Sequence, residues 1–175
     1  MKNHELTNAA NFTNLALRDA FSLEMWGGAT FNVFMCLLHK CPWEHLKTMR
    51  EKIPYVLFQM LLRGANAVGY TNYPNNVVHK FCKQASIYGV DVLCVFNVHN
   101  YIEYLKIWFY AAGSAGGFVE GTLSCTGDVS YPNKGKYDLK YYTNLKRDLS
   151  HMGVHYISVK DMADLLTPHA ATILV

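Results

Sequence analysis

The chain has 175 residues, of which 51% are hydrophobic and 17% are charged, and its formal net charge is +3. This composition is typical of a globular domain and excludes an intrinsically disordered chain. No long run of lysine and arginine is present, so ordinary solvated surface charge is favoured over a nucleic-acid interface.

The first segment, residues 1–20, is predicted to be a helix or tail of no assigned structure. Residues 1–13 lack the features of a secretory signal and of an Arg-rich transit peptide. The most apolar stretch, residues 102–112, contains two charged residues and is too short to span a bilayer. The cysteines form no CxxC pair, which favours reduced thiols; they are Cys36, Cys41, Cys82, Cys94 and Cys125.

Short apolar runs rich in β-forming residues recur along the chain at intervals of about 30 residues, the length of one βα unit. The predicted strands cover residues 21–26, 55–62, 90–96, 117–125 and 154–159. Their nearly continuous apolar character is expected of parallel strands that are buried on both faces.

The intervals between these runs show the apolar spacing of helices. The predicted buried faces are Phe31, Phe34, Met35 and Leu38; Trp43, Leu46 and Met49 in a helix that starts at Pro42; Val77, Val78, Phe81 and Ala85; Leu105, Trp108, Phe109 and Ala112; and Leu139, Tyr142, Leu145 and Leu149. The small residues at 112–117 are predicted to end a helix and form a turn.

Repeated strand–helix alternation predicts a parallel sheet covered by helices. An open doubly wound sheet is the alternative, but it usually carries a glycine-rich phosphate loop, and neither GxGxxG nor GxxxxGK[ST] occurs. We therefore predict an α/β fold, a partial (β/α)8 TIM barrel over residues 21–175. A complete barrel usually needs about 250 residues.

The C-terminal ends of strands carry the reactive groups of such barrels. Arg63 ends the second run, and its guanidinium suits a small carboxylate or, equally, a structural ion pair. Lys160 ends the fifth run beside Asp161, and an ion pair with an acid at the rim is favoured over a role as base, Schiff-base former or carbamylated metal ligand.

The remaining chemistry-bearing residues form no complete site. His99 follows a strand and is the best metal-ligand candidate, but no HxH or HExxH motif occurs. His39 and His45 are expected on solvated helix surfaces. No GxSxG motif is present, so a hydrolase triad has no support.

Several strand-end segments resemble the carboxyltransferase domain of pyruvate carboxylase. They are FSLEMWGGATF at 21–31, FQMLLRGANAVGY at 58–70 and YISVKDM at 156–162, with CPWE at 41–44, AAGSAGG at 111–117 and TGDV at 126–129. The likeness runs from about residue 21 to residue 175. It is greatest to animal versions, which implies the mitochondrial matrix; a cytoplasmic location is the alternative.

The resemblance implies a barrel that moves a carboxyl group from carboxybiotin to pyruvate, giving oxaloacetate, in a biotin-dependent ligase of gluconeogenesis and anaplerosis. It implies that Arg63 binds the substrate carboxylate and the enolate, that Tyr70 lies at the substrate and biotin side, and that carbamylated Lys160 binds a divalent zinc or manganese ion. Biotin would arrive on a carrier domain outside this chain. The intact parent would also use ATP and form a homotetramer, with no membrane or nucleic-acid partner.

Some of the family pattern is absent. Residues 18–20 copy only the first three letters of the Arg-Asp-Ala-His-Gln motif of the family's first strand, so we assign no metal role there. The family's His-x-His ligands and catalytic threonine would lie beyond residue 175. Asn32, Cys94 and Asn97 stand where the family has Asp, Arg and Asp.

We therefore expect strands two to six of a barrel that is inactive alone and that aggregates or needs a partner, because open sheet edges stay unpaired. Two alternatives stay open. One is a subunit of a biotin-dependent oxaloacetate decarboxylase or transcarboxylase with the same barrel. The other is a non-catalytic remnant that acts by binding, which the substitutions at 32, 94 and 97 favour.

Overall fold

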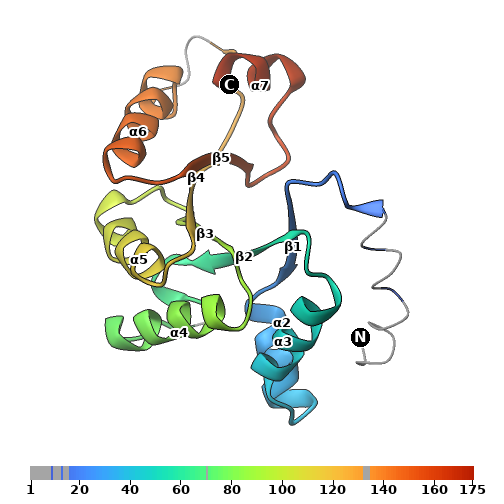
Figure 1. The fold of residues 1–175 in the computed structure, drawn as a ribbon. Coiled ribbons are helices and arrows are strands. Elements are labelled where there is room, and N and C mark those ends of the chain that lie inside the picture. The colour runs from blue at the N-terminus through green and yellow to red at the C-terminus, as the bar shows by residue number, and fades with distance from the viewer. Residues whose placement is uncertain (1–8, 10–12, 14–15, 70, 132–134) are drawn as a thin grey trace.

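The chain folds around one parallel sheet, seen in a computed structural model that describes residues 9, 13, 16–69, 71–131 and 135–175 (Figure 1). The five strands of this sheet follow one another in chain order. They are β1 (Ser22–Trp26), β2 (Leu57–Arg63), β3 (Val92–Phe96), β4 (Phe118–Cys125) and β5 (Tyr156–Asp161). All five predicted strands are confirmed, and β5 continues to Asp161, so Lys160 lies within the strand.

Helices connect successive strands and pack on the outer face of the sheet (Figure 1). They are α2 (Gly28–Asn32), the π-helical turn η1 (Val33–Leu37), α3 (Pro42–Lys52), the 3-10 turn η2 (Gly64–Asn66), α4 (Asn75–Ile87), α5 (Ile102–Ser114), α6 (Leu139–His151) and α7 (Pro168–Leu174). Helical crossovers keep neighbouring strands parallel, which confirms the α/β class and the partial barrel. The predicted element at residues 1–20 falls mostly outside the described residues.

The main core lies between the sheet and these helices. Phe58, Met60 and Leu62 alternate along β2 and are fully buried, and Leu105 and Trp108 of α5 join them in one cluster. Each such side chain contributes about 1.5–3 kcal/mol when it is fully removed from water. Among the described residues, no helix is long and apolar enough to cross a membrane, and the apolar stretch at 102–112 lies in α5 against this core.

The other face of the sheet is concave, and rings from its two edge strands meet across it. The ring of Phe21, directly before β1, lies 5.2 Å from the ring of Tyr156 in β5, measured between centroids. The ring of Phe118 in β4 lies 5.9 Å from that of Tyr156. The sheet therefore curls until its first and last strands face each other, as in a small barrel whose interior is just wide enough for side chains.

The buried helix face predicted within residues 31–38 is partly wrong, because the α-helix α2 continues as the π-helical turn η1. The N–H of Leu38 donates to the carbonyl of Val33, five residues back, at 3.0 Å. This wider winding rotates side chains away from the positions that a 3.6-residue period predicts. Phe34 is buried as expected, but Met35 and Leu38 are exposed. Val77 and Leu139, at the first turns of α4 and α6, are exposed as well, whereas the other predicted face residues of these helices are buried or partly buried.

His45 is buried in α3, contrary to the predicted solvated position. Its ring stacks on Phe34 of η1 with 4.1 Å between the centroids. Burial lowers the pKa of His45 below its usual value, because a desolvated imidazole disfavours the charged form. The sequence did not reveal this packing, since it depends on the π-helical turn that carries Phe34.

Acid should therefore destabilise the fold through His45. The unfolded imidazole binds a proton below about pH 6.5 while the folded one resists it, so the free energy of unfolding should be level above about pH 7.5 and fall below about pH 6.5. Denaturant unfolding at a series of pH values measures this. His45→Gln should flatten the pH dependence, and His39→Gln, at an exposed position, should not. An unchanged dependence in the first variant would contradict the assignment.

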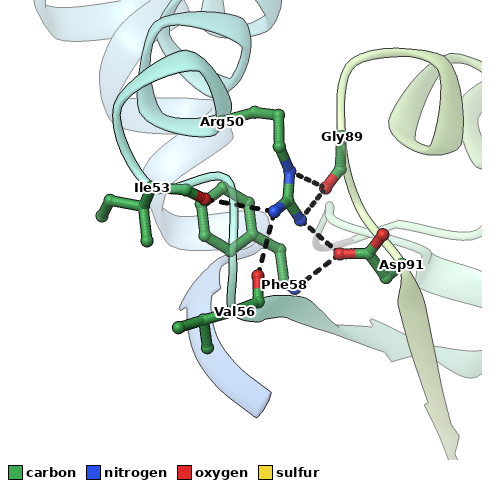
Figure 2. A network of polar contacts seen from close by, with 6 residues as sticks. All are labelled: Arg50, Ile53, Val56, Phe58, Gly89 and Asp91. Carbon is green, nitrogen blue, oxygen red and sulfur yellow. Dashed lines mark hydrogen bonds and ion pairs between the residues drawn. The ribbon is translucent and has the colours of Figure 1, made fainter. Parts of the chain in front are cut away.

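A cationic clamp ties α3 to the start of the sheet at the end opposite the strand C-termini (Figure 2). Nη1 of Arg50 donates to the carbonyl oxygens of Ile53 at 3.2 Å and Val56 at 2.9 Å. Nε and Nη2 of Arg50 donate to the carbonyl oxygen of Gly89 at 3.2 and 2.8 Å. One guanidinium thus holds the segment before β2 against the turn before β3.

The anionic partner in this clamp is Asp91. Its Oδ2 pairs with Nη2 of Arg50 and also accepts the backbone N–H of Phe58 at 2.7 Å. The guanidinium carbon lies 3.8 Å from the centroid of the Phe58 ring, a cation–π contact. The clamp therefore joins α3, β2 and the segment directly before β3 through one partly buried ion pair.

Candidate active-site end of the sheet

Arg63 is the last residue of β2 and lies at the C-terminal end of the sheet, beside Phe96 of β3. Its backbone N–H donates to the carbonyl of Ala67 at 2.8 Å, which closes the tight η2 turn. The side chain is partly buried and borders two depressions. One has a volume of about 350 Å³ and is also lined by Asn66, Asn72, Phe96, Asn97, Val98, His99 and Tyr104.

The second depression at Arg63 opens beside β1. It has a volume of about 270 Å³ and is lined by Glu24, Met25, Trp26, Gly27, Gly28, Ala29, Thr30 and Leu61 in addition to Arg63. Gly28 is required here, because a β-carbon at this position would lie 2.3 Å from the carbonyl oxygen of Val68. The close approach of these two backbone segments brings the start of α2 to the depression that Arg63 borders.

Lys160 reaches the same end of the sheet from β5, where it pairs in register with Ser124 of β4. Its Nζ lies 5.7 Å from the centroid of the Phe96 ring, within cation–π range. Phe96 also lines the larger depression beside Arg63. The structure therefore brings both predicted cations close to Phe96 at this end of the sheet. Tyr70, the third predicted site residue, lies outside the described residues.

The favoured ion pair between Lys160 and an acid is not formed in the part of the chain that the structure describes. Asp161 instead accepts the backbone N–H groups of Leu166 at 2.8 Å, Leu165 at 3.2 Å and Ala163 at 3.3 Å. The N–H of Leu166, followed by the other two, holds the pKa of Asp161 below its usual value. Asp161 thus shapes the turn after β5.

The β3–α5 loop is held by two asparagines. Oδ1 of Asn97 accepts the N–H groups of His99 at 2.9 Å and Tyr101 at 3.2 Å. Asn100 is buried, with φ at 52°, and exchanges two bonds of 2.8 Å with the backbone N–H and carbonyl of Ser124. Sequence reasoning missed Asn100, although an asparagine-rich segment after a strand is a signal for left-handed backbone and side-chain caps.

Cys94 of β3 is buried, and its thiol contacts polar side chains of β4. Its Sγ lies 3.1 Å from Oγ1 of Thr122 and 3.5 Å from Oε1 of Glu120. Burial, with the nearby charges of Glu120 and Glu24, raises the pKa of Cys94 to about 12. Because the thiolate is the reactive form, the Cys94 thiol is a poor nucleophile at neutral pH.

Lys160 and the other described residues do not form a divalent-metal site by themselves. Within the described residues, no group of three or more His, Cys, Asp or Glu side chains could hold a metal ion. Lys160 faces an aromatic ring, and His99 is exposed and borders the depression beside Arg63. We therefore derive no step through a metal from this chain.

No protein-family model matches the chain. It is 50% identical over 175 residues to the mitochondrial pyruvate carboxylase of Rattus norvegicus, 51% identical over 175 residues to that of Homo sapiens, and 45% identical over 172 residues to the pyruvate carboxylase of Staphylococcus aureus. These matches cover 98–100% of this chain but only 15% of each relative.

Solved structures of the same family match the fold of this chain. The carboxyl transferase domain of Rhizobium etli pyruvate carboxylase with pyruvate matches with a TM-score of 0.92 and 46% identity, covering 99% of this chain and 30% of that one. The same domain with oxamate and biotin also matches with a TM-score of 0.92 and 46% identity, covering 99% of this chain and 29% of that one. Over its whole length, this chain is a homologue of part of the carboxyltransferase domain of pyruvate carboxylase.

Proposed function

We propose that the chain forms the substrate-binding side of a carboxyltransferase site that moves a carboxyl group from carboxybiotin to pyruvate, giving oxaloacetate. The observation that carries this proposal is the position of Arg63, partly buried at the end of β2 where two depressions meet. The Rhizobium etli domain, which shares this fold, is described with pyruvate and with oxamate and biotin. Carboxybiotin would supply the carboxyl group that is transferred.

Arg63 would grip the carboxylate of pyruvate with two parallel hydrogen bonds. The same guanidinium would stabilise the enolate of pyruvate, because a fixed positive charge stabilises negative charge that develops during the reaction. Lys160, which lies 5.7 Å from the centroid of the Phe96 ring, would add a second positive charge at this end of the sheet only in its uncarbamylated form. Tyr70 would face the biotin side.

The resemblance to pyruvate carboxylase supports a further proposal about domains, cofactors and assembly outside this chain. A biotinyl carrier domain, ATP and a homotetrameric assembly would belong to the intact parent enzyme, together with the divalent metal that carbamylated Lys160 would help to bind. The relatives include mitochondrial and bacterial enzymes. We propose the mitochondrial matrix as the location, since the animal relatives show the higher identities among those compared.

Arg63→Ala should weaken the binding of oxamate, a pyruvate analogue, by about 10- to 100-fold, because it removes a charged pair of hydrogen bonds. Calorimetric titration of the full chain measures the change. Arg63→Lys should retain part of the affinity, since an ammonium keeps the charge but not the fork geometry. Arg147→Ala, on the exposed surface of α6, is the matched control and should bind as the wild type does. Equal affinities of the wild type and Arg63→Ala would contradict the role.

A second candidate function is binding without catalysis. The substitutions at Asn32, Cys94 and Asn97 favour it, and two of them have a structural reading. Asn97 caps the loop with a neutral acceptor. Among the described residues, no lysine or arginine forms an ion pair with Glu120, the carboxylate that lies 3.5 Å from the Cys94 thiol. The geometry of the loop is thus retained while charge is removed. A chain that binds oxamate but gives no transfer from carboxybiotin when the missing domains are supplied would favour this candidate.

A further inference from the structure

A cavity opens on the outer face of the sheet, between α5 and the turn that leads from α6 into β5. Its volume is about 570 Å³, which is within the range of small-molecule sites. Val119, near the start of β4, and His155, directly before β5, line it. The cavity therefore lies at the end of the sheet opposite to Arg63 and Lys160, which are at the C-terminal ends of their strands.

The floor of this cavity is apolar. Phe109 and Val119 are 6% and 3% exposed, and Met152 and Val154 are partly buried beside them. Gly121 of β4 permits this packing, because a β-carbon there would lie 3.2 Å from Cγ1 of Val154 and 3.4 Å from the ring of Phe109. A floor of this kind suits the hydrocarbon part of a ligand.

His155 presents a hydrogen-bond donor at the same cavity. Its Nδ1 accepts the backbone N–H of Val119 at 3.1 Å, and its own backbone N–H donates to the carbonyl oxygen of Val119 at 2.8 Å. A ring nitrogen that accepts a hydrogen bond carries no proton, so the proton of the neutral ring is on Nε2. The His155 side chain is exposed, and it can therefore offer this N–H to an acceptor on a ligand.

The charge at the cavity is positive. Among the described residues that line it, Lys106 is the one lysine or arginine, and none is aspartate or glutamate. Nζ of Lys106 pairs with Oε1 of Glu103 at 2.7 Å, with 52% of one side chain and 65% of the other exposed. An ion pair this exposed contributes little to stability, so the ammonium can exchange Glu103 for a carboxylate on a ligand.

We propose that this cavity binds an amphiphilic carboxylate with a medium-length alkyl chain. The carboxylate accepts hydrogen bonds from Lys106 and from Nε2 of His155, and the alkyl chain lies over Phe109, Val119 and Val154. A carboxylate only accepts hydrogen bonds, which matches the two donors, and an alkyl chain matches the apolar floor. The site goes beyond the proposed carboxyltransferase function and does not depend on it.

Calorimetric titration of the full chain with octanoate, below its micellar concentration, tests this site. We expect one octanoate per chain, bound up to about 15-fold more tightly than hexanoate, because each buried methylene contributes up to about 4-fold. Octanol lacks the charge and should bind about 3- to 5-fold more weakly, and Lys106→Ala should weaken octanoate binding to the same extent. Lys140→Ala, at an exposed position of α6, is the matched control and should bind as the wild type does.

Gly113→Leu locates the ligand in this cavity, which Gly113 lines from the last turn of α5. A β-carbon at this position would lie 3.9 Å from Cγ2 of Val119, an ordinary contact, so leucine should fill the cavity without breaking the helix and should abolish octanoate binding. Gly113→Ala adds only the β-carbon and should retain binding. Thermal unfolding checks that both variants fold, and both should be at least as stable as the wild type.

Three outcomes would overturn the proposal. The first is a wild-type chain that does not bind octanoate. The second is a folded Gly113→Leu variant that binds octanoate as tightly as the wild type, which would place the ligand elsewhere. The third is equal affinity for octanol and octanoate together with unchanged binding in Lys106→Ala, which would show that the carboxylate is not recognised. Oxamate binding at Arg63 is measured separately, so a failure here leaves the proposed function untouched.

Discussion

Replacing Arg50 by alanine is expected to lower the free energy of unfolding by about 2–3 kcal/mol, less than the roughly 3–5 kcal/mol for breaking a fully buried ion pair, because Arg50 and Asp91 are only partly buried. The guanidinium donates hydrogen bonds to the carbonyl oxygens of Ile53, Val56 and Gly89 and forms an ion pair with Asp91. Its loss would leave the Asp91 carboxylate without its cation and strip the Phe58 ring of the group that covers it. Equilibrium denaturant unfolding measures the difference.

Conservative variants separate charge from geometry in this clamp. Arg50→Lys keeps the positive charge but cannot reach three carbonyl groups at once, so it should fall between the wild type and Arg50→Ala. Asp91→Asn keeps an acceptor for the N–H of Phe58 and should cost less than Arg50→Ala. Lys140→Ala, at an exposed position of α6, should change stability by less than about 0.5 kcal/mol. A loss below about 1 kcal/mol in Arg50→Ala would show that water replaces the guanidinium.

The fold was predictable because its signals are local. The run at 90–96 is apolar at almost every position, and β3 is buried along its whole length. Leu105, Trp108 and Phe109 follow the helical period, and all are buried in α5. The rule that strand ends carry reactive groups selected Arg63 and Lys160, and both lie at the same end of the sheet.

The features that the sequence did not reveal depend on distant partners or on irregular backbone. Arg50 and Asp91 are 41 residues apart, and nothing near either residue indicates that they pair. His45 was placed on the wrong surface because a π-helical turn brings Phe34 over it. Lys160 was expected to meet an acid, but the nearest acid in sequence, Asp161, is taken by three backbone N–H groups of the following turn.

Asn100→Ala is expected to lower the free energy of unfolding by about 3 kcal/mol. It removes two bonds of 2.8 Å and leaves the N–H and carbonyl of Ser124 unpaired in a buried place; an unsatisfied buried group costs about 1–3 kcal/mol. Alanine at a φ of 52° adds about 1 kcal/mol of backbone strain. Thermal and denaturant unfolding measure the total.

Substitution of Asn100 by glycine or aspartate separates the contribution of the lost hydrogen bonds from that of backbone strain. Asn100→Gly removes the same two bonds but tolerates the left-handed backbone, so it should be about 1 kcal/mol less damaging than Asn100→Ala. Asn100→Asp keeps the acceptor for the N–H of Ser124, yet it buries a charge against the Ser124 carbonyl and should improve as the pH falls and the carboxyl is protonated. Equal losses in the glycine and alanine variants would show that backbone strain contributes nothing.

The same variants connect the loop to the site. Asn97 and His99 lie in the loop that Asn100 anchors, and both line the depression beside Arg63. If Asn100 fixes that wall, Asn100→Gly should weaken oxamate binding even under conditions where the chain is fully folded, because the wall then samples more conformations before it binds. Oxamate affinity equal to that of the wild type would mean that Arg63 acts without this wall, and that Asn100 serves stability alone.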